Sequence, residues 1–107
     1  MAKIKVLYKK PYEQPKVVEI EDTYESIRDL IGGYIEFIDI PEVEGVEVIL
    51  DEEGKLKGLD PNFDIPEYFD TIVGPALIVG SDGFGGTISL TADQVSKVLE
   101  YIYDNEY

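Results

Sequence analysis

Residues 91–104 carry the pattern that most restricts what this chain can fold into. Apolar side chains recur there at the spacing of one helix face, at Val95, Val98, Leu99, Ile102 and Tyr103. Thr91 and Gln94 match a capping box, and Leu90 and Val95 match a hydrophobic staple. The sequence therefore predicts an amphipathic helix over 91–104, which must bury its apolar face against another layer of structure.

Alternating residues near the start of the chain predict that this other layer is a β-sheet. Residues 3–8 and 16–21 alternate between apolar and charged side chains, the pattern of half-buried strands. Pro11 and Pro15 lie between them, so we expect a β-hairpin in which lysines face glutamates. We expect the lysine-rich first strand at a sheet edge, where its charge discourages pairing with other molecules.

A second, shorter helix is predicted over residues 22–32. Asp22 is the expected N-cap, with Glu25 as its capping-box partner. Gly32-Gly33 ends the helix, because a glycine there can adopt the left-handed conformation. The expected apolar face consists of Tyr24, Ile27, Leu30 and Ile31.

The middle of the chain predicts further strands. We expect strands over 34–40 and 46–51, the second of which turns at Glu53-Gly54 into a hairpin with 55–59. Residues 60–70 contain Pro61 and Pro66 and are interpreted as an irregular, partly buried connection.

The most apolar stretch of the chain is residues 71–80, which predicts a central strand covered on both faces. Pro75 is expected to mark its start or a bulge. Residues 81–86 predict a glycine-rich turn, after which 87–90 pair back as a short strand. No repeat or linker interrupts the pattern, so residues 1–107 are expected to form one domain.

These elements predict the α+β class with the order β-β-α-β-β-β-β-(β)-α. We expect an antiparallel or mixed sheet of about five or six strands, with both helices on one side.

The 107-residue chain contains neither Cys nor His. Their absence excludes disulfides and thiolate metal sites and removes the commonest general base. We therefore expect a protein that is not an enzyme and uses no cofactor. No apolar run approaches the ~20 residues of a membrane span, and no secretory signal is recognisable, so we expect a cytoplasmic protein without a membrane partner.

The net charge of −14 is unevenly distributed. Residues 1–16 hold five lysines and one glutamate, whereas residues 17–107 hold four basic and 22 acidic side chains. Such a balance opposes direct nucleic-acid binding. It is compatible with simple solubility, or with an acidic surface that binds a protein partner and mimics nucleic-acid phosphates. The candidate interaction residues are Glu42, Glu44, Glu47, Asp51, Glu52 and Glu53.

An alternative hypothesis is a module that binds a small ligand or a divalent cation. Asp60, Asn62 and Asp64 match the first oxygen ligands of a calcium loop, although the later Gly and Glu of an EF-hand are missing. Together with residues 80–86 they could line a pocket. A phosphate site at 81–86 is disfavoured because Asp82 is repulsive and no basic residue follows.

Aromatic residues are abundant, with eight Tyr and four Phe. Tyr8, Tyr12 and Tyr68 are less needed for a core, which leaves open an oligomer or interface that uses exposed rings. Six others are expected in the core, namely Tyr24, Tyr34, Phe37, Phe69, Tyr101 and Tyr103.

Several segments resemble, in order, a small bacterial and phage family known as domain of unknown function 3846. They are residues 32–36, 51–56, 58–62, 72–75 and 89–94, which consist of turn and cap residues rather than catalytic motifs. The resemblance implies a protein carried by a phage, plasmid or other mobile element. It assigns no active-site residue.

Overall fold

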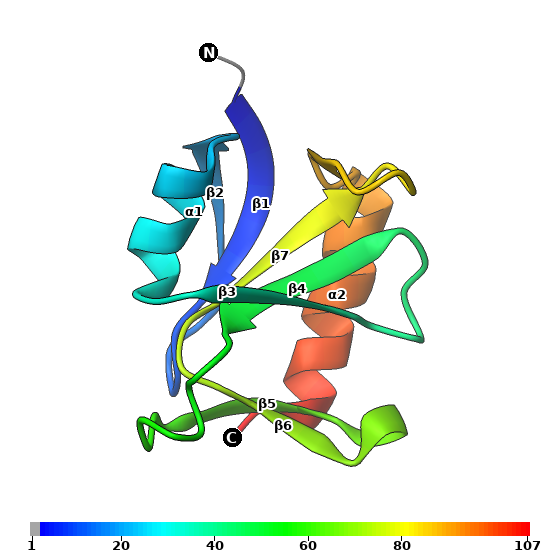
Figure 1. The fold of residues 1–107 in the computed structure, drawn as a ribbon. Coiled ribbons are helices and arrows are strands. Elements are labelled where there is room, and N and C mark those ends of the chain that lie inside the picture. The colour runs from blue at the N-terminus through cyan, green and yellow to red at the C-terminus, as the bar shows by residue number, and fades with distance from the viewer. Residues whose placement is uncertain (1–2) are drawn as a thin grey trace.

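The computed structural model describes residues 3–107 and confirms the α+β class and the order of elements. Two helices accompany eight strands in this part of the chain (Figure 1). The elements are β1 (Lys3–Lys9), β2 (Lys16–Glu21), α1 (Tyr24–Ile31), β3 (Ile35–Asp39), β4 (Val46–Asp51), β5 (Pro61–Ile65), the 3-10 turn η1 (Pro66–Tyr68), β6 (Asp70–Val73), β7 (Ala76–Ser81), β8 (Thr87–Ile88) and α2 (Ala92–Asn105).

The main sheet is antiparallel with the strand order β2-β1-β7-β4-β3, and β8 pairs with the end of β7. β7 is central and its residues 76–80 are buried, as its apolar sequence predicts. The first hairpin is confirmed, with Lys3 opposite Glu21 and Lys5 opposite Glu19. The edge position predicted for its lysine-rich strand is wrong, because β1 also pairs with β7 and leaves β2 at the edge.

The two helices cover opposite faces of this sheet, which corrects the expected placement on one side (Figure 1). On one face, Ile27 and Ile31 of α1 pack against Ile49 and Leu77. On the other face, α2 packs with the β5–β6 hairpin against the alternate side chains of the same strands. Neighbouring residues of a strand point to opposite faces, so continuous apolarity along β7 requires a cover on each.

The caps of α1 and α2 differ in how well they follow prediction. α2 has the expected capping box between Thr91 and Gln94. The N-cap of α1 is Thr23 rather than Asp22, because the Asp22 carboxylate accepts a hydrogen bond from Thr87 while Thr23 Oγ1 accepts one from the Ser26 amide. Gly32 ends α1 with φ of 87°, as predicted.

The hairpin predicted between 46–51 and 55–59 is wrong. β4 is paired with β3 on one side and β7 on the other, so no edge of β4 is free for another strand. Residues 52–58 instead form successive turns, with the Gly54 amide donating to Asp51 O and the Leu59 amide to Gly54 O.

The connection expected over 60–70 is in fact part of a hairpin, formed by β5 and β6. Gly74, with φ of 75°, and Pro75 divide the apolar run 71–80 between this hairpin and β7. Pro75 thus marks the start of the central strand, as expected, because proline has no amide to donate within a sheet.

Five of the six aromatic residues expected in the core are exposed. Tyr101 is buried, but Phe69 and Tyr103 are 98% and 79% exposed, and Tyr24, Tyr34 and Phe37 are also exposed. Aliphatic side chains and the buried Phe63 fill the interior instead. α2 is oriented so that Tyr101, beside Val98 and Ile102, faces the sheet in place of Tyr103.

A buried amide attaches the β5–β6 hairpin to the main sheet. Asn62 Nδ2 donates to the carbonyl oxygens of Lys9 and Gly74, each at 2.9 Å. The backbone carbonyl of Asn62 accepts from the Tyr107 amide, and Phe63 pairs with Glu106 in an isolated bridge. Residue 62 therefore joins β1, the start of β7 and the end of the chain.

Replacing Asn62 by Ala should leave two buried carbonyl groups without their donor. We expect the free energy of unfolding to fall by about 2–6 kcal/mol, at about 1–3 kcal/mol per unsatisfied group, as measured by urea denaturation. The matched control is Asp60→Ala, at an exposed position, which should change the value by less than about 0.5 kcal/mol. Equal midpoints for both variants and the unaltered protein would contradict this role.

Candidate functional site

The six candidate interaction residues do not form one surface. Glu42 and Glu44 lie in the loop before β4, whereas Glu52 and Glu53 follow its far end. Six strand residues separate the two pairs by roughly 17–20 Å at ~3.3 Å per residue. Glu47 lies within β4, half-buried and opposite Asp39 of β3.

Asp51 is buried and has a structural role. Its carboxylate contacts Lys57 Nζ at 2.6 Å and accepts the Glu53 amide at 2.8 Å. Burial alone would raise the pKa of Asp51, but these two donors outweigh it and lower the pKa below its usual 3.8. A Cβ at Gly33 would lie 2.6 Å from Lys57 Nζ and 2.7 Å from Asp51 Oδ2, so a larger residue there would displace the pair. Asp51 is thus unavailable to a partner.

An acidic groove runs between α2 and the loop before β4. One hollow, of about 180 Å³, is bordered by Glu42, Val43, Lys97, Glu100, Tyr101 and Asp104. A second, of about 360 Å³, shares Val43 and Lys97 with it and continues to the N-terminal end of α2. We call the surface formed by these two hollows the α2 groove. It is bordered by four carboxylates, those of Glu42, Asp93, Glu100 and Asp104, and by the ammonium group of Lys97.

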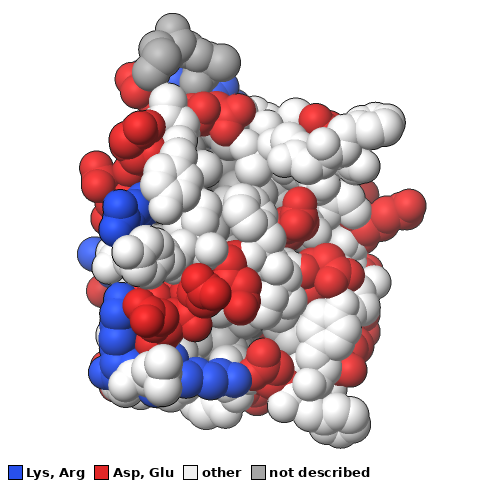
Figure 2. Space-filling model, in the orientation of Figure 1, with Lys and Arg blue, Asp and Glu red and all other residues white. Residues whose placement is uncertain are grey.

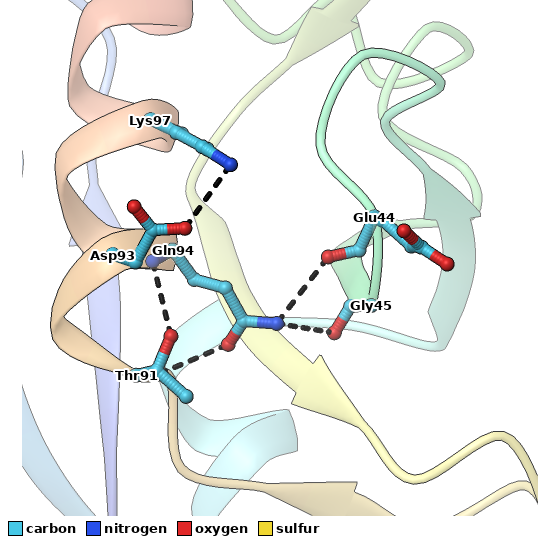
Figure 3. A network of polar contacts seen from close by, with 6 residues as sticks. All are labelled: Glu44, Gly45, Thr91, Asp93, Gln94 and Lys97. Carbon is cyan, nitrogen blue, oxygen red and sulfur yellow. Dashed lines mark hydrogen bonds and ion pairs between the residues drawn. The ribbon is translucent and has the colours of Figure 1, made fainter.

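Polar contacts hold the two walls of the α2 groove together (Figure 3). The Gln94 side chain completes the helix cap through Oε1, and its Nε2 donates to the carbonyls of Glu44 and Gly45, both at 3.3 Å. Lys97 Nζ lies 3.0 Å from Asp93 Oδ2. The Glu44 carboxylate points away from the helix, so this residue contributes its backbone to the groove (Figure 3).

Negative charge is concentrated around Tyr101, at the base of the groove. Its hydroxyl donates to Glu67 Oε1 at 2.7 Å. Burial and then the carboxylates of Glu67, Glu42 and Asp64 raise the pKa of Tyr101. Because two segments distant in the sequence supply these carboxylates, the charge here is a product of the tertiary fold.

The acidic side chains of α2 are poorly placed for helix stability. The last turn of α2 has no basic residue, although the C-terminal end of a helix favours cations. Glu100 and Asp104 stand four residues apart, the spacing at which like charges repel. The helix therefore carries these carboxylates at a small cost in stability.

The face that carries α1 is different. Figure 2 shows acidic side chains scattered among uncharged ones, with Lys and Arg along one side and the lower edge. Opposite charges lie close together along the left side and the lower edge, whereas the right part of this view shows acidic and uncharged side chains.

The glycine-rich turn has its amides directed at its own carboxylate. Asp82 Oδ1 accepts the amides of Phe84, at 2.7 Å, and Gly86, at 3.0 Å. These two bonds lower the pKa of Asp82. Because the amides are already paired, the turn offers no cradle for a phosphate, in agreement with the sequence.

The three candidate oxygen ligands are not brought together. Asn62 is committed to two carbonyls, Asp64 accepts the Thr71 hydroxyl at 2.7 Å, and Asp60 is exposed. Within residues 3–107, no group of three or more Asp, Glu, His or Cys side chains is arranged to hold a metal. The prediction of a pocket lined by residues 60–64 and 80–86 is wrong, because β5 and the glycine-rich turn lie at opposite ends of β7 (Figure 1).

The family comparison agrees with the resemblance found in the sequence. Residues 4–103 match the family described as Domain of unknown function (DUF3846), a span that runs from β1 into the last turns of α2. The chain belongs to this family. No curated protein and no solved structure gave a significant match to this DUF3846 chain. Neither helix described for it has the length and apolar character needed to cross a membrane.

Sequence reasoning found one wall of the groove and missed the other. Glu42 was a candidate, but Asp93, Glu100 and Asp104 were not. Their spacing of seven and four residues places them on one outward helix face, with Lys97 between them. That spacing is the signal in this DUF3846 sequence that could have identified them.

Replacing Lys57 by Gln should leave the buried Asp51 carboxylate without its cationic partner. We expect a loss of about 1–3 kcal/mol of unfolding free energy at pH 7, below the 3–5 kcal/mol of a fully buried pair because Lys57 is 40% exposed. Lys55→Gln is the control, since its pair with Asp70 is exposed and should contribute less than about 1 kcal/mol.

The pH dependence follows from the lowered pKa of Asp51. A depressed pKa stabilises the fold above the unfolded value, near 3.8, and this stabilisation is lost as the pH falls through the folded value. The difference between Lys57→Gln and the unaltered protein should therefore shrink below about pH 3.8 in urea titrations. A difference that persists unchanged in acid would rule out the ion pair as its cause.

Proposed function

We propose that this protein is a non-enzymatic interaction protein that binds a basic segment of a partner protein in the α2 groove. The observation that supports this is the groove itself, in which four carboxylates face solvent beside a single lysine. A cationic segment would neutralise the mutual repulsion of these groups. Such pairing favours fast, salt-sensitive association.

The cost of the acidic residues to α2 also supports the proposal. Carboxylates kept for solubility can occupy many surface positions, and the end of a helix that favours cations is among the poorest. Local rules of stability are commonly broken at functional sites. The row of carboxylates along α2 is also compatible with mimicry of nucleic-acid phosphates, as the sequence suggested.

The setting of this interaction is part of the same proposal. We expect the protein to act in the cytoplasm, without binding nucleic acid itself. The family resemblance favours an origin in a phage or mobile element, whose partner would be a host or phage protein.

The test is a pull-down from a bacterial lysate with three baits. They are the unaltered protein, Glu100→Lys/Asp104→Lys in the groove, and Glu52→Lys/Glu53→Lys at the far end of β4. Both double variants change the net charge equally. We expect a protein captured by the unaltered and the far-end baits, lost with the groove bait, and released on raising the salt from about 0.1 M to about 1 M, where the Debye length falls from ~10 Å to ~3 Å.

Stability measurements separate binding from folding in this experiment. The groove variant places lysines near the C-terminal end of α2, so its unfolding free energy should equal or exceed that of the unaltered protein by about 0.3–1 kcal/mol. Equal losses with both double variants would show that net charge alone controls capture. Capture of no protein at either salt concentration would refute the electrostatic proposal.

A further inference from the structure

A separate hollow, outside the α2 groove, lies where the β5–β6 hairpin meets the end of the chain. It measures about 370 Å³ and belongs to no part of the α2 groove described above. Its walls are formed by two aromatic rings, one proline, one threonine and two carboxylates: Phe69, Tyr107, Pro66, Thr71, Asp64 and Asp70.

The position of Phe69 suits a binding role better than a folding role. The ring is 98% exposed, so it contributes nothing to the core. The residue follows the 3-10 turn with φ of 52°, a conformation that glycine or asparagine adopts more readily. Tyr107, across the same hollow, is 55% exposed. Two large rings are thus presented to solvent at one site.

The two carboxylates of the hollow are fixed by Thr71 between them. Its hydroxyl donates to Asp64 Oδ1 at 2.7 Å, and its amide donates to Asp70 Oδ1 at 2.9 Å. Lys55 also pairs with Asp70 Oδ1. All three contacts involve the Oδ1 atom of Asp64 or Asp70. The Oδ2 atom of each carboxylate therefore remains available to a ligand.

Aromatic rings beside carboxylates are the chemistry that recognises an organic cation. A ring face attracts a cation, and a planar guanidinium can stack on a ring while donating in pairs to a carboxylate. We propose that this hollow binds the guanidinium group of an arginine side chain. The inference rests on the proposed function, since it assigns that arginine to the basic segment held in the α2 groove.

The two sites are electrostatically continuous. The Asp64 carboxylate borders the hollow and also acts on the Tyr101 hydroxyl, which borders the groove. Glu67, the acceptor of that hydroxyl, belongs to the same 3-10 turn as Pro66. We therefore expect one extended basic segment to meet both sites.

The hollow can be tested without the partner, using N-ethylguanidinium and its neutral, planar counterpart N-ethylurea as probes. We expect N-ethylguanidinium to shift the amide NMR signals of Phe69, Thr71 and Tyr107 with millimolar half-saturation. N-ethylurea should bind about two- to fivefold more weakly, because a cation–π contact at an exposed site contributes about 0.5–1 kcal/mol. Equal responses to both probes, or no response at these residues, would overturn the proposal.

Two phenylalanine variants complete the test. Phe69→Ala removes a ring with no core contacts and should weaken N-ethylguanidinium binding about two- to fivefold without unfolding the protein. Phe84→Ala is the matched control, since its ring is 94% exposed in the glycine-rich turn at the opposite end of β7, and it should leave binding unchanged. Equal binding by all three proteins would show that Phe69 has no role.

The outcome is separable from that of the groove experiment. The Glu100→Lys/Asp104→Lys protein keeps every residue that borders the hollow and should still bind N-ethylguanidinium. Failure of the unaltered protein to capture any lysate protein, with intact probe binding, would refute only the groove. Intact capture with no probe binding would refute only the hollow.

Discussion

The structure depends on the burial of strand β7 on all sides. Residues 76–80 are fully covered, with β1 and β4 paired at the two edges and a helix on each face. Each buried large aliphatic side chain contributes about 1.5–3 kcal/mol, and β7 supplies three of them, Leu77, Ile78 and Val79. Gly80 shows how close the packing is, since a Cβ there would lie 2.8 Å from the Ser89 carbonyl oxygen.

The site positions follow from this arrangement. Because β7 needs a cover on each face, α2 is fixed against one face, beside the loop that leads into β4. The same face also receives the β5–β6 hairpin, attached by Asn62. The α2 groove and the aromatic hollow therefore form along the border of a single layer, supplied by segments that are distant in sequence.

Local chemistry made much of the fold predictable. The capping box of α2, the glycine stop of α1 and the first hairpin depend on neighbouring residues, and the sequence identified all three. The errors arose where tertiary pairing decides. Residues 55–59 have a strand-like pattern, but both edges of β4 were already occupied. The site was predicted only in part, because Glu42 meets Glu100 and Asp104 only after α2 has docked.

The exposed aromatic residues are a further case in which tertiary packing, rather than the local sequence pattern, decides the outcome. Phe69 and Tyr103 fit an apolar pattern in the sequence, yet the aliphatic side chains and Phe63 suffice to fill the interior. Their exposure, like the carboxylates near the end of α2, reduces stability or solubility without benefit to the core. Under the proposed function, one partner with a basic segment would contact both Phe69 and these carboxylates.

The most direct measurement is site-specific cross-linking from within the groove in living bacteria. A photoreactive phenylalanine derivative in place of Lys97 lies at the centre of the α2 groove, and the same derivative in place of Leu56, 88% exposed beyond β4, is the control. The account predicts a cross-link from position 97, and not from position 56, to a partner peptide rich in Arg and Lys. Equal cross-linking from both positions, or a cross-linked peptide that is neutral or acidic, would contradict it.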